Sequence, residues 1–469
     1  MNRKFNQEER SEQIEHKHYK EHEKRSQAPQ KNFKKVKTAS IRREMFSENL
    51  IPVESKKILE DFDKIVENVR VMSGKQKFSL YGEIKKLSHQ LTDDRNSRRL
   101  GYMNEARNLS AYINYFMWWN LIRLTRLFAN LPKTAFSALD SENPIAIDVG
   151  SGTLTVVIAL WLARPELRIR NISWYCMDLS QTALSAGEDL YLSIAAKTMK
   201  ENEDFSAWKI IRVRGAFGTK IKEKADLITC GNVFNEILQR NEMPTDFLAK
   251  KYTCELLSYL KNENSTVFLV EPGDPHSARF ISLMRDALIR EDFLPIAPCP
   301  HTESCPMAGR THGSLTNPYG KNAKWCNFAF NTDSVPERLL RISEKAGLPK
   351  ERAGLSFIIA KKTAEIRNRT NAVVAPVEIT KNQGHLHIAL QAHKLNDHAS
   401  STTFIRIASD FIRLPELHKS GYYACSQFGL LLAIDESHTQ PKNGELLQIK
   451  TPENLDEIDK KSGGIIVRI

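Results

Sequence analysis

Between about residues 142 and 290, short apolar runs of strand length alternate with stretches that have the pattern of helices. The strand candidates are IAIDVG, ISWYCMD, WKIIRVRG, ADLITCGN and STVFLVEPG, and VVIALWLARP is interpreted as the first crossover helix. Further helices are expected from Ser180, around Cys254, and from Ser277 to Arg290. Continuous apolar strands are typical of a parallel sheet that is covered on both faces. The order therefore predicts an α/β fold with a doubly wound, Rossmann-like sheet.

A glycine turn closes the first of these strands, in the segment Asp148-Val-Gly150-Ser151-Gly152-Thr153. A turn of this kind lets a nucleoside cofactor approach the backbone, and the helix that follows offers partly positive N–H groups. No lysine of the P-loop type follows the glycines, which argues against a nucleoside-triphosphatase. We expect the S-adenosylmethionine site of a class I methyltransferase, with Asp148, Gly150, Ser151 and Gly152 binding the cofactor.

Three further loops end at the same edge of the predicted sheet, where ligands bind in such folds. One of them follows the fifth strand in Glu271-Pro-Gly-Asp274-Pro. Asp178 ends the second strand and is expected to accept the ribose hydroxyls, although an acid at a helix start would also fit there. Asn232, Asn235 and Glu236 follow the fourth strand. Asn232 is predicted to contact the cofactor, and all three are candidate catalytic residues. A purely structural role for Asn235 and Glu236 fits the sequence equally well.

The charge of the chain is unevenly distributed. The net charge is +12, and residues 1–45 contribute 13 Lys and Arg residues against 7 Asp and Glu residues. Such a tail is expected to be disordered and either to contact nucleic acid or only to aid solubility. Its glutamates argue against a mitochondrial presequence, and the chain has neither an apolar signal segment nor a run long enough for a membrane span.

The regions beside the alternating segment differ from it. Residues 55–72 and 104–130 have helical periodicity, and Arg107, Arg123 and Arg126 are expected at the polar edge of the second helix. Beyond residue 385 the chain has the pattern of short strands and turns. The predicted organisation is a basic tail (1–45), a helical domain (46–135), a class I methyltransferase-like domain (136–290), and a metal-binding cysteine loop with a β-rich module (291–469).

Three cysteines lie in a proline-rich, irregular segment, and a fourth lies far downstream. They are Cys299, Cys305, Cys326 and Cys425. Four thiolates suit zinc or an iron–sulfur cluster equally well by number, and the spacing matches neither the usual zinc finger nor a ferredoxin. Unliganded thiols, or His301 as an alternative ligand, also fit the pattern. The remaining cysteines are interpreted as buried apolar residues: Cys176, Cys230 and Cys254.

These features together resemble the methyltransferase-like assembly factors of the small ribosomal subunit, which are found in bacteria and mitochondria. The resemblance rests on the glycine turn, on Asn235-Glu236-Ile-Leu and on Val-Glu271-Pro-Gly. It rests most specifically on Cys-Pro-His-x3-Cys-Pro and Trp325-Cys-x-Phe328, and it covers roughly residues 100–430. The resemblance implies a [4Fe–4S] cluster bound by the four cysteines named above, and binding to small-subunit rRNA and assembly intermediates.

The sequence leaves two functions open. One is an assembly factor that binds rRNA, because no catalytic motif of amino-methylating enzymes follows the fourth strand. The other is an active rRNA methyltransferase, for which a polar acceptor site close to the methyl donor would suffice. Leu154 stands where a third glycine is usual and is expected to crowd the cofactor. We expect a monomer off the ribosome, without a membrane, in a bacterial cytoplasm or alternatively in the mitochondrial matrix.

Overall fold

The computed structural model describes residues 41–92, 101–199, 206–238, 242–261, 263–307, 324–363, 372–377, 389–394 and 402–469. The predicted basic tail lies outside this set except for residues 41–45. Within it, no helix is long and apolar enough to cross a membrane.

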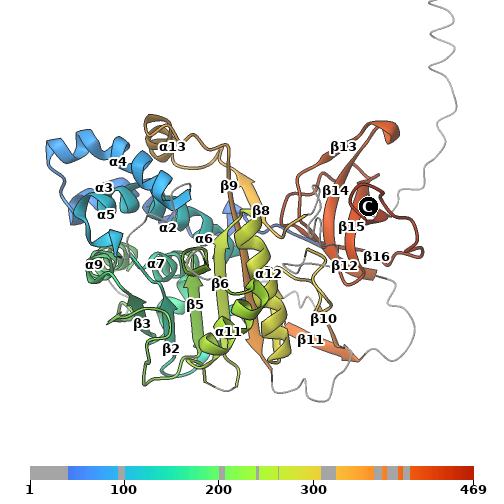
Figure 1. The fold of residues 1–469 in the computed structure, drawn as a ribbon, viewed down its shortest axis with the longest axis horizontal. Coiled ribbons are helices and arrows are strands. Elements are labelled where there is room, and N and C mark those ends of the chain that lie inside the picture. Colours follow the sequence, from blue (N-terminus) through green and yellow to red (C-terminus); the bar gives the residue numbers. More distant parts are fainter. Residues whose placement is uncertain are drawn as a thin grey trace, which may run out of the picture. The chain divides into compact units, whose positions relative to one another are not determined.

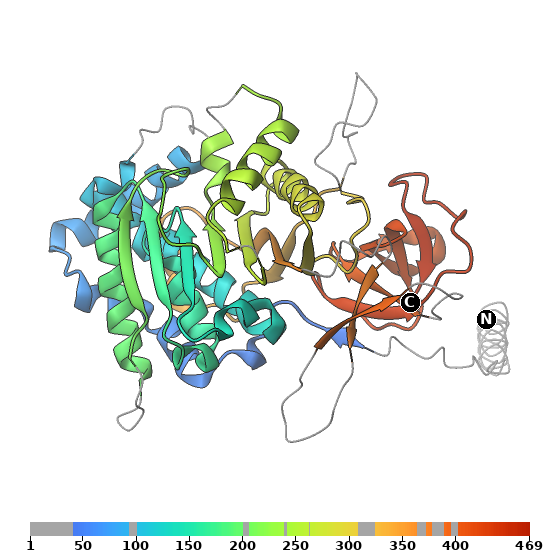
Figure 2. The same cartoon turned by 90° about the horizontal axis from the view of Figure 1, so that it is seen from below.

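The main sheet has eight strands in the described residues, and its strand order is β4-β3-β2-β5-β6-β9-β7, with β8 paired to β9 (Figures 1 and 2). The strands from β4 to β6 are parallel, whereas β9 is antiparallel to its neighbours. This order, with an antiparallel strand inserted between β6 and β7, is that of a class I methyltransferase. The strands are β2 (Ile145–Val149), β3 (Ser173–Asp178), β4 (Lys209–Arg214), β5 (Leu227–Gly231), β6 (Thr266–Pro272), β7 (Phe293–Ala297), β8 (Phe328–Asn331) and β9 (Arg352–Lys362).

The five predicted strands and the crossover helix are confirmed at their positions. The insertion of β9 beside β6 was not predicted, and it means that three strands of this sheet come from residues beyond 290. Strand side chains alternate between two hydrophobic clusters: Leu227 and Phe268 pack into one, while Ile228 and Leu269 pack into the other. A sheet buried on both faces explains why its strands are continuous apolar runs.

One face of the sheet is covered by helices from the N-terminal half of the chain, which share its larger hydrophobic cluster. The helix predicted over residues 55–72 is two helices separated at Asp61, and the long helix up to Asn130 contains a π-helical segment. These elements are η1 (Glu48–Leu50), α2 (Val53–Glu60), α3 (Phe62–Val69), α4 (Gly74–Thr92), η3 (Tyr102–Asn104), α5 (Ala106–Ala111), η4 (Tyr112–Met117), α6 (Trp118–Asn130), η5 (Lys133–Asp140), α7 (Thr155–Ala163), α8 (Pro165–Arg168) and α9 (Gln181–Thr198).

Helices α11 and α12 cover the other face together with the short helix α10, and Figure 2 shows helices on both sides of the sheet. Their bounds are α10 (Phe234–Ile237), α11 (Thr245–Leu257) and α12 (Pro275–Arg290), and α13 (Glu337–Lys345) lies between β8 and β9 in the chain. Helix α12 begins at Asp274, whose carboxylate accepts hydrogen bonds from the backbone N–H groups of His276 and Ser277. This cap fixes where β6 gives way to the helix.

The C-terminal part forms a second, largely antiparallel sheet with the order β1-β16-β12-β14-β15-β17, and β13 pairs with β14. The prediction of a β-rich module is thus confirmed in its strand content. The strands are β1 (Arg42–Arg43), β12 (Thr402–Ile407), β13 (Ile412–Leu414), β14 (Lys419–Ser426), β15 (Gly429–Asp435), β16 (Leu446–Lys450) and β17 (Ile465–Arg468), with η8 (Pro415–Leu417) before β14. A separate hairpin pairs β10 (Ala372–Val377) with β11 (Ala389–Lys394).

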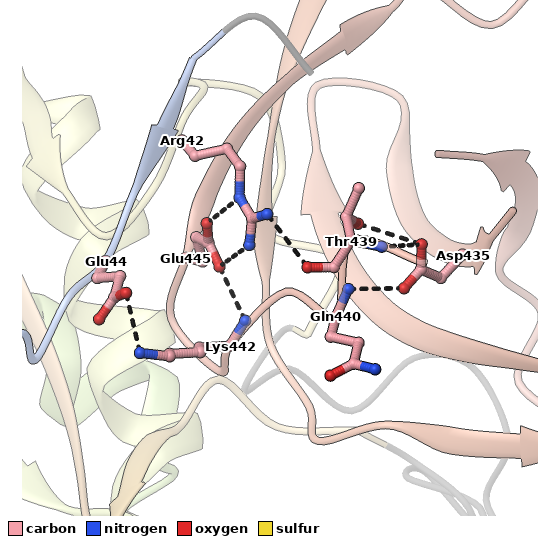
Figure 3. Close-up of polar contacts among 7 residues, drawn as sticks. All are labelled: Arg42, Glu44, Asp435, Thr439, Gln440, Lys442 and Glu445. Atoms are coloured by element: carbon pink, nitrogen blue, oxygen red, sulfur yellow. Dashed lines mark hydrogen bonds and ion pairs between the residues drawn. The ribbon is translucent and has the colours of Figure 1, made fainter. Parts of the chain in front are cut away.

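Residues 41–51, which we call the N-terminal strap, join this sheet from the opposite end of the chain. Arg42 in β1 forms a two-pronged ion pair with buried Glu445, with Nε–Oε1 and Nη2–Oε2 distances of 2.6 and 3.0 Å. It also donates to the carbonyl of Thr439, and Glu44 pairs with Lys442 at 2.9 Å (Figure 3). Because a planar guanidinium engages both carboxylate oxygens, this pair fixes the position of β1 and its register against β16.

Candidate functional site

Asp148 stabilises the glycine turn through hydrogen bonds made by its buried carboxylate. Its two carboxylate oxygens accept hydrogen bonds from the hydroxyls of Ser151 (2.5 Å) and Thr229 (2.6 Å), and the side chain is buried. Burial raises the pKa of Asp148 to about 6, and the two hydroxyl donors act against that rise. Asp148 therefore joins the turn to strand β5.

The turn needs glycine at Gly150, which has a φ of 66° and would carry its Cβ only 2.1 Å from Cγ2 of Val233. Gly152 also has a positive φ, of 50°. A Cβ there would enter the space bordered by Asp178 Oδ2 and Met103 Cε, each 4.0 Å away. Both positions thus favour glycine through their positive φ, and Gly150 also through its close approach to Val233.

Leu154 packs in the core rather than crowding the cofactor, contrary to the sequence-based expectation. It adopts a left-handed conformation with a φ of 58°, and its side chain is fully buried in the larger hydrophobic cluster. The close approach that a third glycine often allows is provided by Gly187 in α9, where a Cβ would lie 2.4 Å from the carbonyl carbon of Thr153. The glycine that this packing requires is therefore on the neighbouring helix.

Asp178 lies at the end of β3 with both oxygens engaged by the backbone. Oδ2 accepts the N–H of Gly152 at 3.0 Å, and Oδ1 accepts the N–H of Ser180 at 2.8 Å. The cap of helix α9 is Ser180, whose hydroxyl accepts the N–H of Ala183, so Asp178 is not the helix cap. Its carboxylate is held beside the turn with lone pairs to spare for hydroxyl donors.

The loop after β5 is tied to the end of β6 by Glu271. Its oxygens accept the backbone N–H groups of Phe234 at 2.8 Å and Asn235 at 3.2 Å, and burial raises its pKa to about 8. Asn232 has a φ of 57° and donates its N–H to the carbonyl of Val270. Glu271 was not predicted as a site residue, although an acid at the end of an apolar strand is the signal that could have indicated it.

Cys230 lies in β5, and burial raises the pKa of its thiol well above the ordinary value, so it is not an activated nucleophile. Cys176 is buried as predicted, whereas Cys254 is exposed, and the prediction that it is buried was wrong. Arg126 was expected at a polar helix edge, but it is buried and paired with Glu48 at 2.6 Å.

The four predicted metal ligands come from separate places in the fold. Cys299 and Cys305 follow β7, Cys326 precedes β8, and Cys425 lies in β14. The pKa values of Cys326 and Cys425 are raised well above the ordinary value. Burial is the largest cause, and the charges of the other cysteines are the next largest. The thiols therefore lie close enough for their charges to act on one another.

Two arginines adjoin these thiols. Arg285 is close to Cys299 and Cys305 and donates to the carbonyl of His301, while Arg406 is close to Cys299, Cys326 and Cys425 and donates to the carbonyl of Pro298 at 2.8 Å.

His301 Nε2 lies 3.1 Å from Cys425 Sγ. Within the described ranges, no group of three or more His, Cys, Asp or Glu side chains has the arrangement of a metal site. The thiols therefore lie near one another, but their arrangement in this structure is not that of a metal site.

The cysteine segment contacts the methyltransferase-like sheet directly. The carbonyl of Gly273 accepts hydrogen bonds from Trp325 Nε1 at 3.0 Å and from Asn327 Nδ2 at 3.2 Å. These two residues flank Cys326, and Gly273 follows Glu271 by two positions. The backbone beside one ligand is therefore anchored to the loop that Glu271 tethers.

Residues 128–407 match the model of the family described as mitochondrial small ribosomal subunit Rsm22. The chain belongs to the Rsm22 family. Among curated proteins, no sequence matches it. The match spans the sheet from its first strand, Cys299, Cys305 and Cys326, and β12, and it ends before Cys425.

Several solved structures are similar to this Rsm22-family chain, all at low identity. A putative class I S-adenosylmethionine-dependent methyltransferase from Listeria monocytogenes is 10% identical, with 68% of this chain and 90% of that chain covered and a TM-score of 0.30. Magnesium protoporphyrin IX methyltransferase from Synechocystis PCC 6803, with bound SAM, is 10% identical over 63% and 100%, with a TM-score of 0.27. The strand order of the sheet, rather than these low TM-scores, identifies the fold.

Proposed function

We propose that this chain is an rRNA-binding assembly factor of the small ribosomal subunit, built on an S-adenosylmethionine-binding fold that also holds a [4Fe–4S] cluster. The observation that carries the proposal is the approach of four thiols from separate segments, Cys299, Cys305, Cys326 and Cys425, beside two arginines. Binding of S-adenosylmethionine alone would not require these four thiols.

The donor set fits a cluster by its chemistry. Burial and the charges of neighbouring thiols raise the pKa of Cys305, Cys326 and Cys425, and a metal group would relieve that repulsion because it binds the thiolate forms. Arg406 would offset part of the net negative charge of four thiolates on a cluster, whereas Arg285 is also paired with Asp286 at 2.7 Å. When bound, the cluster would supply a cross-link among the segments that carry the four cysteines. Zinc is the alternative, since it takes the same four ligands.

Anaerobic purification separates the two metals. The proposal expects about four iron and four sulfide per chain, with broad visible absorbance, as is general for such clusters. One zinc per chain in a colourless protein would refute the cluster.

The residues of the glycine turn and Asp178 suit S-adenosylmethionine. Asp178 is fixed by backbone N–H groups on both oxygens and is proposed to accept the ribose hydroxyls, and Gly150, Ser151, Gly152 and Asn232 would line the rest of the site. Calorimetry with S-adenosylmethionine tests this directly, and absence of binding at millimolar ligand would contradict it.

The proposed partner is small-subunit rRNA in assembly intermediates. The family description names the mitochondrial small ribosomal subunit, which favours the mitochondrial matrix over a bacterial cytoplasm, and the net charge of +12 suits a phosphate backbone. A monomer that co-sediments with small subunits or their precursors at low salt is expected. Failure to co-sediment would refute the assembly role.

Methyl transfer to rRNA is a second function, favoured by one observation. Glu271 tethers the loop of Asn235 and Glu236 at the same sheet edge as Asp178, so that polar groups lie beside the proposed methyl donor. Transfer of a labelled methyl group to small-subunit RNA would support methyl transfer if Asn232→Ala abolishes it. The control Cys254→Ser, which changes an exposed side chain, should retain it. If no small-subunit precursor is methylated, this second function is refuted and only the binding role remains.

A further inference from the structure

The long helix that runs through α5, η4 and α6 carries a row of half-exposed side chains. Between residues 112 and 129, Tyr112, Phe116, Asn120 and Arg123 are the only side chains that are not buried. Their spacing of four, four and three residues places them on one face of the helix, which we call the helix stripe. The π-helical segment begins at Tyr112, and the rings of Tyr112 and Phe116 lie stacked with their centroids 6.0 Å apart. Segments of this kind occur frequently at functional sites.

The helix stripe lies along the edge of the sheet that holds the proposed cofactor site. Tyr112 is close enough to Asp178 and Glu236 for their charges to add to the effect of burial, which together raise its pKa to about 12. At the other end, Arg123 Nη1 donates to the carbonyl of Gly354 at 2.8 Å, and Gly354 lies beside Gly273 where β9 passes the end of β6. The stripe therefore extends from the proposed ribose acid to the loop after β6.

Two cations meet at the Arg123 end without a carboxylate. Lys350 Nζ lies 5.3 Å from the ring centre of Tyr115 and 5.1 Å from that of Trp119, and burial together with the charge of Arg123 lowers its pKa to about 7. Arg123 donates to Gly354 and to the side chain of Asn120. Among the described residues, neither cation forms an ion pair with a carboxylate.

Two arginines that are more deeply buried do have such partners. Arg126 on the same helix pairs with Glu48 at 2.6 Å, and Arg168 pairs with Glu54 at 3.1 Å. A partly buried charge is costly unless an opposite charge compensates it. An arginine and a lysine that lack a carboxylate, yet retain access to solvent, thus form a site for an anion from outside the chain.

We propose that the helix stripe and Lys350 bind a nucleotide of single-stranded RNA, with its base against Tyr112 and Phe116 and its phosphate at Arg123 and Lys350. Aromatic rings that stack a base beside cations that hold the backbone are the usual elements of single-strand recognition. This inference rests on the proposed function, because it names the part of the RNA that would approach the cofactor site. It places the base end of the site nearer to Asp178 and Glu236 than the phosphate end.

The test uses the full chain and an unstructured oligouridine that carries one 4-thiouridine. Arg123→Gln and Lys350→Met should each weaken binding about tenfold, since each removes a charge-assisted contact. The slope of log affinity against log salt should fall by about 0.7 for a lost phosphate contact. Photocrosslinks in the wild type should map to the peptide that contains Tyr112 and Phe116, and Tyr112→Phe should retain them.

The matched control is Arg107→Gln, which removes an exposed arginine from the same helix that lies 3.8 Å from Glu83. It should change affinity less than about twofold. Unchanged thermal unfolding would show that each variant folds, and Arg123→Lys should restore part of the affinity if the charge matters.

The possible failures are distinguishable. If the wild type co-sediments with small subunits but Arg123→Gln and Lys350→Met bind the oligouridine as tightly as it does, the helix stripe is not the site and the assembly role stands. If the wild type binds neither small subunits nor the oligouridine, both proposals fall. If Arg123→Gln instead abolishes binding of S-adenosylmethionine and leaves RNA affinity unchanged, the anion is the carboxylate of that cofactor, and the present proposal is overturned.

Discussion

The glycine turn and the cysteine centre differ in how their ionisable side chains are stabilised. At the turn, Asp148 and Asp178 have all four carboxylate oxygens engaged by hydroxyl or backbone donors from the turn itself, from β5 and from the start of α9. At the cysteine centre, buried thiols from distant segments raise one another's pKa. The comparison teaches that the acids of the first site are already hydrogen-bonded within the chain, whereas the thiols of the second are the groups proposed to bind a metal.

The largest expected effect is at the cysteine centre. With the proposed metal bound, Cys326→Ser should abolish metal binding and lower the free energy of unfolding by at least about 3 kcal/mol, because a structural metal contributes its binding free energy to folding. Metal analysis and thermal unfolding measure both effects. The exposed Cys254 offers the control, and Cys254→Ser should change neither. Full metal content in Cys326→Ser would show that the two sites do not differ as proposed.

At the turn, a substitution should affect binding more than folding. Gly150→Arg forces a side chain against Val233 at a φ of 66°, so affinity for S-adenosylmethionine should fall about 10- to 100-fold. Calorimetry gives the affinity. Gly429→Ala is the matched control, since it strains a φ of 111° with nothing within 4 Å of the added Cβ. Equal loss in both variants would mean that backbone strain, not the contact with Val233, is responsible.

A smaller effect is expected where α9 packs against the turn. Gly187→Ala would place a Cβ 2.4 Å from the backbone of Thr153 and should lower the free energy of unfolding by about 1–3 kcal/mol. In Gly82→Ala, on helix α4, the added Cβ meets nothing within 4 Å, so this change should raise stability by up to about 1 kcal/mol. Chemical denaturation of the two variants compares them, and the same sign in both would contradict the packing argument.

The smallest effect concerns the contact between the two sites. Trp325→Phe removes one of the two hydrogen bonds to the carbonyl of Gly273 and should lower the free energy of unfolding by about 1 kcal/mol. Because Asn327 still donates to that carbonyl, metal content should stay unchanged. A fall in metal content as large as that of Cys326→Ser would show that the two regions are one unit rather than two.

The strands and helices of the sheet were predictable because each is a continuous run with its own periodicity. Thus Ile145–Val149 and Thr155–Ala163 lie where their patterns place them. The place of β9 between β6 and β7 was not predictable, since the order of strands in a sheet depends on pairing between distant residues and leaves no local pattern. The strap pairing of Arg42 with Glu445 was missed for the same reason.

The candidate sites divide in a similar way. The glycine turn and Asp178 follow from local sequence, whereas the approach of Cys425 to the other cysteines was expected only from the family resemblance. Leu154 was misjudged because its type suggests bulk, while its left-handed backbone directs the side chain into the core. Arg123 was placed at a polar helix edge, but the sequence could not indicate that it lacks a carboxylate partner.

The N-terminal strap has a consequence for the order in which the molecule can be completed during synthesis. Arg42 and Glu445 are 403 residues apart in the chain. At synthesis rates of about 5–20 residues per second, Arg42 must wait roughly 20–80 s before its partner exists. Phe46 packs against Phe330 of β8, with ring centres 5.0 Å apart, whereas Met45 lies against Gly444, so Phe46 alone can hold the strap while β1 has no strand to join. Closure of β1 onto β16 is therefore among the last steps of folding on the ribosome, and a prematurely released chain would lack it.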